Sequence, residues 1–130
     1  MRFRVAFRSE RGQSLTEFAL VLPLLAMLLF GIIQFGITFN DYISLTDAVR
    51  AGSRKGAVAR HLGDPVGETI AQVRTSAEDL DPAQLQISVE STWQPGEDVE
   101  VTASYPYKIK LFGIPLKEGR MSSTTTERVE

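Results

Sequence analysis

The sequence predicts an α+β protein with one long N-terminal helix and a small head made of a short helix and a three-stranded antiparallel sheet. Three observations support this prediction. Residues 18–40 contain no formally charged side chain. Residues 66–80 repeat apolar side chains at steps of three and four, which is the spacing of one helix face. Three later runs alternate apolar and polar side chains, which is the spacing of half-buried strands.

The charge-free run is long enough to cross a membrane. Its 23 residues reach roughly 34 Å as a helix, against ~30 Å for the hydrocarbon core of a bilayer. Residues 20–30 (LVLPLLAMLLF) show no polar face, unlike the core helix of a small soluble protein. A cleaved secretory signal is the main alternative, but its apolar stretch is shorter and ends in a small-x-small site that does not stand out here.

The long helix is predicted to continue beyond the membrane, from about Ser14 to Arg60, because no proline follows Pro23 until Pro65. Within the apolar run, Gln34 and Thr38 lie four residues apart and so share one helix face. They are candidates for hydrogen bonds to a partner helix in the membrane.

The short helix of the head begins at Asp64-Pro65, an N-cap followed by a proline in the first helical position. This short helix is predicted to end near Asp81, with an apolar edge that needs a partner surface. The alternating runs 85–90 and 99–105 flank the turn sequence at 94–97 (QPGE), so they predict a β-hairpin that supplies that surface.

A third alternating run, 121–129, closes the sheet. Pro106 and residues 113–115 (GIP) are interpreted as a break between the second and third strands. Helices are expected to cover one face of this sheet.

Charge divides the chain into two parts. The first twelve residues carry a net charge of +3 and the remainder carries −5. A basic tip attached to an acidic body fits binding to anionic lipid rather than to nucleic acid, which needs a basic folded surface. Basic residues before the apolar run favour a cytoplasmic N-terminus, although Arg50, Arg54 and Lys55 follow it.

The sequence predicts no catalytic, metal or cofactor site. His61 is the only histidine and the chain has no cysteine, so a usual zinc site is excluded. The acidic residues 78–81 lack the glycine and the spacing of a calcium loop, and they are expected to be solvated. Trp93, Tyr105 and Tyr107 are interpreted as packing residues rather than a binding surface.

The junction at residues 11–18 (RGQSLTEF) is the most informative stretch. It begins with the last of four arginines, and it places the single carboxylate of Glu17 at the start of the apolar run, five residues after Gly12. A charge at the edge of a membrane helix is costly and marks a functional position. From the residues alone, the alternative is that Glu17 reaches the membrane surface and has no role.

Residues 11–25 (RGQSLTEFALVLPLL), 31–36 (GIIQFG) and 48–54 (AVRAGSR) resemble the TadE-like minor pilins, or pseudopilins, of tight-adherence (Flp-type) pilus systems. The resemblance is strong over about residues 11–59 and faint beyond. Gln34 stands where that family often carries a second acid, so an intramembrane ion pair is not expected there.

The resemblance implies a pilin-like fold and cleavage between Gly12 and Gln13 by a prepilin peptidase. The chain would then divide into a leader (1–12), a membrane helix with its continuation (13–61) and a head (62–130). Glu17, next to Phe18, would be the assembly contact, pairing with the new α-amino group at Gln13 of an incoming subunit.

The implied partners are other pilins, proteins of the pilus assembly platform, the peptidase and membrane lipid. The implied location is the cytoplasmic membrane, crossed once, with the N-terminus inside and the head outside, and a surface pilus after assembly. Two alternatives remain open: a membrane-anchored binding module that never enters a filament, and an anchored enzyme, which a deep polar pocket in the head would favour.

Overall fold

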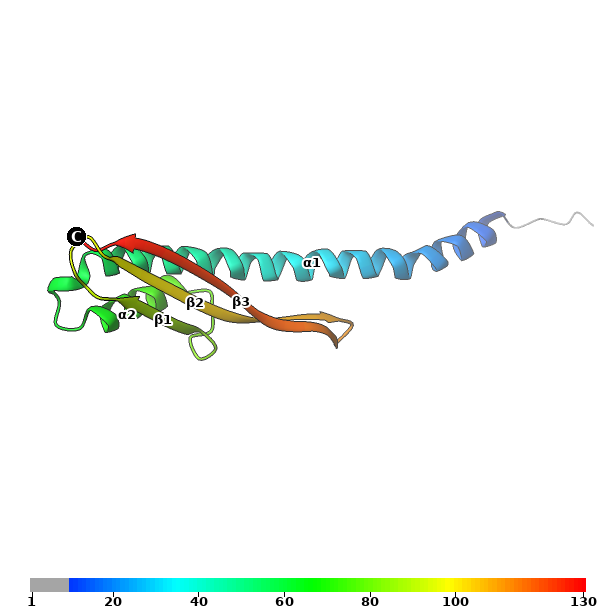
Figure 1. Ribbon diagram of the computed structural model, residues 1–130. Helices are drawn as coiled ribbons and strands as arrows, with labels where there is room; N and C mark the ends of the chain where they lie inside the picture. The colour runs from blue at the N-terminus through cyan, green and yellow to red at the C-terminus, as the bar shows by residue number, and fades with distance from the viewer. Residues whose placement is uncertain (1–9) are drawn as a thin grey trace, which may run out of the picture.

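The computed structural model describes residues 10–130 of the chain, with side chains described from Gly12 onward. The fold is α+β, as predicted (Figure 1). In chain order the elements are α1 (Glu10–Ala57), a 3-10 turn η1 (Ala59–His61), α2 (Pro65–Ser76), β1 (Gln86–Ser91), β2 (Asp98–Leu111) and β3 (Ile114–Arg128). The head packs on the C-terminal half of α1, and the N-terminal half projects away from it.

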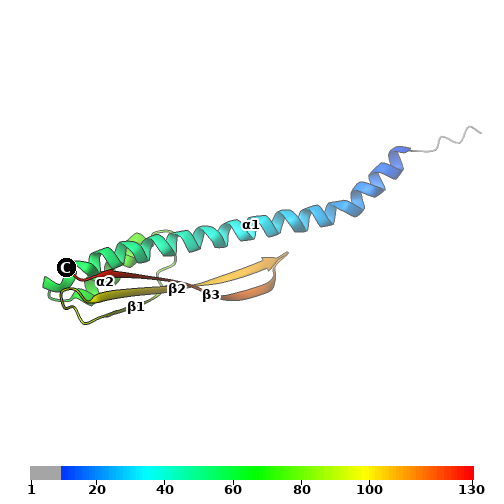
Figure 2. The same cartoon turned by 45° about the horizontal axis from the view of Figure 1, so that its top comes forward.

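Helix α1 has 48 residues and a length of ~72 Å at about 1.5 Å per residue. It begins earlier than predicted and ends at Ala57, three residues before Arg60. Pro23 lies inside it, and Figure 2 shows the helix bending in its blue N-terminal part. A proline inside a helix removes a backbone donor and commonly produces such a bend.

Helix α2 starts as predicted. The Asp64 carboxylate accepts a hydrogen bond from the Gly67 amide at 2.9 Å, and Pro65 occupies the first helical position. The predicted end near Asp81 was wrong, because the helix ends at Ser76. Ala77 leaves helical geometry and a turn follows, in which the Leu80 amide donates to the Ala77 carbonyl at 3.0 Å. Leu80 is still buried. It therefore continues the apolar spacing of α2 although it belongs to the turn that follows the helix.

The sheet has the strand order β1-β2-β3, with both pairings antiparallel. In the first hairpin Val89 pairs with Val101, which confirms the predicted alternating runs. The second pairing places Val101 opposite Thr125, which confirms the third run as a strand.

The predicted break at Pro106 was wrong. Strand β2 continues through Pro106, which pairs with Arg120, and the chain reverses only at Phe112-Gly113. Both turn residues have positive φ, 49° and 84°, as a tight two-residue hairpin turn requires. The pairing of β2 with β1 extends only as far as Gln86–Ser104, so β2 is no longer a central strand at its proline, where a missing amide is tolerated.

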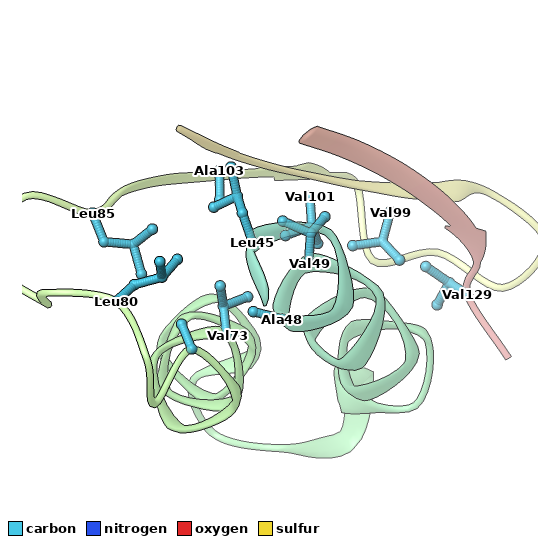
Figure 3. Packing of buried hydrophobic residues seen from close by; sticks show 11 residues of the cluster. Leu45, Ala48, Val49, Val73, Leu80, Leu85, Val99, Val101, Ala103 and Val129 are labelled. Atoms are coloured by element: carbon cyan, nitrogen blue, oxygen red, sulfur yellow. The ribbon is translucent and has the colours of Figure 1, made fainter. Parts of the chain in front are cut away.

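The core lies between one face of the sheet and the two helices, as predicted (Figure 3). Leu45 and Val49 of α1 lie against Val101 of β2, and Val73 of α2 closes the layer; all four side chains are fully buried. Gly52 permits close contact between the helices, because a Cβ there would overlap the Val73 side chain.

Candidate processing and membrane site

The N-terminal half of α1 forms a rod of mostly exposed apolar side chains. This apolar rod comprises residues 18–39, none of which is fully buried. The most apolar 18-residue window of the helix has a mean hydropathy of 2.5 and none of it is buried. Leu20 is 77% exposed and Phe35 is 69% exposed. An apolar surface of this size is not stable in water, so it requires lipid or other helices around it. By length and composition, this one helix is suited to crossing a membrane.

The predicted processing residues lie in the first turns of α1. The Gly12 carbonyl accepts a hydrogen bond from the Thr16 hydroxyl at 2.9 Å. The Gly12–Gln13 peptide bond itself lies within α1, which begins at Glu10. Three leader arginines (Arg2, Arg4 and Arg8) lie outside the described residues, and so does the Arg11 side chain.

Glu17 faces the predicted processing point. Its carboxylate accepts a hydrogen bond from the Gln13 side-chain amide at 3.1 Å, in an exposed contact one helical turn long. Side chains on a helix lean toward its N-terminus, which directs Glu17 toward residue 13. Phe18 is 59% exposed beside it. The structure thus brings Gln13 and Glu17 together within one chain.

The two polar residues in the stretch 18–39 of α1 lie four residues apart and so share one helix face. Gln34 and Thr38 are half-buried, unlike most of their neighbours. The Thr38 hydroxyl donates to the Gln34 backbone carbonyl at 3.0 Å, within α1 itself. The predicted bonding of this pair to a second helix stays a prediction.

The remaining polar candidates are structural or solvated. His61 is exposed in η1. Asp81 organises its turn, and hydrogen bonds from the Gln84 side chain and then the Ala83 amide lower the pKa of its carboxyl. Asp41 behaves in the opposite way: partial burial, and then the charge of Asp79, raise its pKa. Within residues 12–130, no three histidine or acidic side chains group so that they would hold a metal ion.

The aromatic residues of the head pack as interpreted from the sequence. Trp93 and Tyr105 are half-buried against the core. The Tyr105 hydroxyl accepts a hydrogen bond from the Asp81 amide at 3.2 Å. Tyr107 covers Gly119, the residue opposite it on β3.

The far end of the β2–β3 hairpin is a feature that the sequence prediction treats only as a break. The ring of Phe112 lies 5.1 Å from the ring of Phe30, centroid to centroid, at an interplanar angle of 66°. Phe30 belongs to the apolar run of α1, 82 residues earlier in the sequence. The sequence signal was the run 108–117 (KIKLFGIPLK), in which apolar residues concentrate between lysines.

Within residues 12–130, one helix is long and apolar enough to cross a membrane and it carries a small α+β head, an architecture consistent with single-pass membrane anchoring. The model of the TadE-like protein family matches residues 12–54, which confirms the predicted resemblance of this segment to that family. The match includes the candidate residues from Gly12 to Phe18 and ends before α2. No curated protein and no solved structure matches the chain.

Proposed function

We propose that this protein is a minor pilin or pseudopilin, which joins or primes a tight-adherence pilus after its leader is removed at the Gly12–Gln13 bond. One observation carries the proposal. Within the TadE-like segment, Glu17 is exposed at the start of an uncovered apolar helix and is hydrogen-bonded to residue 13. The role rests on helix packing and charge pairing, and it needs no catalytic group or cofactor.

The apolar rod is suited both to the membrane before assembly and to a filament after it. Lipid surrounds it before assembly, and neighbouring helices replace the lipid in a filament. A shallow hollow lies on its surface over Gly31, where an added Cβ would meet no atom within 4 Å. The surrounding side chains are Leu24, Met27, Leu28, Ile32 and Phe35. A hollow of this kind accepts a ridge of side chains from another helix.

Glu17 would set the axial position of one subunit against the next. Cleavage creates a charged amine at Gln13, and two half-buried opposite charges pair favourably where each alone is costly. The contact between Gln13 and Glu17 within one chain occupies the same carboxylate. An incoming amine therefore replaces the neutral amide donor with a cationic donor, which adds an ion pair to the hydrogen bond on the same carboxylate.

The proposed arrangement in the cell follows from the leader. The basic residues before α1 stay in the cytoplasm, the helix crosses the cytoplasmic membrane once and the head lies outside. Residues 1–12 are then leader, 13–61 the membrane helix and its continuation, and 62–130 the head. The prepilin peptidase, other pilins and the assembly platform would be its partners.

Maturation is tested by placing a bulky side chain at the processing point. Gly12→Leu in the full chain, expressed with its peptidase, should retain the leader and give a larger mass than the wild type. Gly31→Leu is the matched control, because it adds the same side chain to an open position on the same helix. Equal masses for Gly12→Leu and the wild type would contradict the proposed processing and favour an anchored module that keeps its N-terminus.

Assembly is tested by removing the charge of Glu17. Glu17→Gln should mature normally but co-purify with other pilins at least several-fold less, because the Gln13 amine loses its ionic partner. Thr16→Ala is the control, since it deletes the adjacent hydroxyl without changing charge. Undiminished association of Glu17→Gln would exclude the pairing role.

A further inference from the structure

The β2–β3 hairpin extends well beyond the rest of the sheet. Beyond Ser104, which pairs with the first residue of β1, strands β2 and β3 continue alone as a two-stranded ribbon. Both views show this ribbon running back along α1 toward its apolar half (Figures 1 and 2). Its turn reaches Phe30, which lies near the middle of the charge-free run 18–40.

We propose that this ribbon end, residues 108–117, is a second membrane-contacting element, which inserts its apolar turn into the lipid leaflet on the side of the head. The inference rests on α1 spanning the membrane. It is independent of whether the chain enters a pilus.

The ribbon end is apolar where it meets α1 and beyond. Phe112, Ile114 and Leu116 are 62%, 66% and 63% exposed, so the contact with Phe30 covers only a small part of this surface. The exposed side chains continue the apolar surface of α1 sideways from Phe30. The lipid that surrounds one of these surfaces therefore contacts the other.

Asp41 on α1 and Lys108 on β2 lie at similar distances from the Phe30–Phe112 contact. Along α1, Asp41 is the first charge and lies eleven residues beyond Phe30, ~16 Å at about 1.5 Å per residue. Along β2, Lys108 lies four residues before Phe112, ~13 Å at about 3.3 Å per residue. A single membrane surface can thus pass close to both charges.

Lys110 is the one charge nearer to the turn, two residues from Phe112. It is exposed, and it alternates with the half-buried Ile109 and Leu111. A lysine can lay its apolar stem along a lipid-facing surface and extend its ammonium group several ångströms toward the headgroups. Its position is therefore compatible with insertion of the turn below the headgroups.

Charge distinguishes this end from the rest of the head. Residues 106–120 contain four basic residues and one acid, whereas the rest of 41–130 contains six basic and thirteen acidic residues. Arg120 is engaged in the head, where its guanidinium donates to the carbonyls of Gln84 and Ser104. The exposed lysines 108, 110 and 117 therefore supply the positive surface, which attracts anionic headgroups.

Backbone polarity limits the insertion to the turn. Unpaired amides and carbonyls cost several kcal/mol each in hydrocarbon, and a two-stranded ribbon has two open edges. Leu111 and Ile114 pair with each other across the turn, and Pro115 carries no amide hydrogen that would need a partner. The segment around Phe112-Gly113 is thus best suited to the apolar region, with Lys108 and Lys117 nearer the headgroups and Lys110 extending toward them.

Site-directed spin labelling tests the proposal directly, because the chain contains no cysteine and each label is unique. The full chain is reconstituted in vesicles of phosphatidylcholine and phosphatidylglycerol, with a label at Ile114→Cys or, as a second position, Leu116→Cys. Two controls are Leu28→Cys in the apolar rod, 61% exposed, and Val58→Cys at the opposite end of the head, 53% exposed. Collisions with oxygen report lipid, and collisions with a soluble nickel chelate report water.

The labels at 114 and 116 should resemble the label at 28, with high oxygen and low nickel accessibility, whereas the label at 58 should show the reverse. Nickel accessibility at 114 and 116 equal to that at 58 would overturn the proposal while leaving the span at residue 28 intact. Protection from both reagents would overturn it too, and would indicate a protein partner such as a second copy. Water exposure at 28 as well would show that the span itself is wrong.

The contribution of the three lysines is tested separately, by changing the lipid. In pure phosphatidylcholine the label at 114 should be several-fold more accessible to nickel than in the anionic vesicles. Changing lysines 108, 110 and 117 to Gln together should remove this difference. A dependence on anionic lipid that survives the triple change would overturn the role assigned to the lysines.

Discussion

The two halves of α1 are one continuous helix in two opposite environments. From Phe18 to Phe39 no side chain is fully buried, and the surface is almost wholly apolar. From Leu45 to Gly56 the helix buries a stripe of side chains under the sheet and against α2. The buried stripe comprises Leu45, Ala48, Val49, Gly52, Ser53 and Gly56. One half depends on surroundings outside the chain, whereas the other supplies the core of the head.

Glycines show the same contrast. Gly31 and Gly36 have open space where a Cβ would be. At Gly56 a Cβ would lie 3.1 Å from a Val99 methyl carbon, and at Gly52 it would overlap Val73. A small residue therefore leaves room for an external partner in the first half and permits an internal contact in the second. Glycine thus permits packing within the chain where the head covers α1, and leaves room for packing against another molecule where it does not.

The largest expected effect comes from deleting a core side chain of the second half. Leu45→Ala should lower the free energy of unfolding of the head by about 2–5 kcal/mol, because Leu45 is fully buried and its removal leaves a cavity. Urea titration in detergent micelles, followed by the emission of Trp93 against the core, measures this change. Leu28→Ala removes the same atoms from the exposed half and should leave the titration unchanged; equal losses would contradict the division of α1.

A smaller effect is expected from adding one methyl group to each half. Gly52→Ala should destabilise the head by about 1–3 kcal/mol, because the new methyl forces α1 and α2 apart at Val73. Gly36→Ala meets no atom within 4 Å and should not lower the urea midpoint. An unchanged midpoint for Gly52→Ala would show that the two helices approach less closely than described.

The attachment of α2 to the buried half depends in part on its N-cap. Asp64→Ala should cost about 1 kcal/mol of head stability, because the Gly67 amide loses its acceptor. The urea midpoint measures the loss, and Glu78→Ala, which removes an exposed acid beyond the end of α2, is the control. Equal shifts for the two variants would attribute the effect to general charge rather than to capping.

The smallest effect is expected at the border between the halves, where partial burial and Asp79 raise the pKa of Asp41. A folded pKa above the unfolded value of 3.8 means that ionised Asp41 opposes folding at neutral pH. This cost diminishes as the pH falls through the folded pKa and is gone below 3.8.

Asp79→Asn should therefore lower the pKa of Asp41 and stabilise the head at pH 7 by a few tenths of a kcal/mol. The amide oxygen still offers the Ser44 hydroxyl an acceptor. Carboxyl NMR titration of Asp41 and urea titrations at pH 7 and pH 3 measure the two effects. A pKa that does not move on Asp79→Asn would show that burial alone raises it.

Local patterns in the sequence predict most of the elements. The charge-free run, Asp64-Pro65 and the alternation in residues 85–129 predict both helices and all three strands, because each pattern follows from the repeat of its own element. The same patterns do not reveal where a neighbour lies. Leu80 has helical spacing but belongs to a turn, and Pro106 suggests a break but is tolerated where β2 has lost its β1 partner.

The sequence by itself thus determined the apolar helix, the junction from Gly12 to Phe18 and the general class of the head. Tertiary structure alone decided which half of α1 is covered, and that the turn at Phe112 reaches Phe30. The physical reason is that helix and strand periodicities depend on residues a few positions apart. The contact between Phe30 and Phe112 instead depends on the register of two long strands and on how the sheet packs against α1.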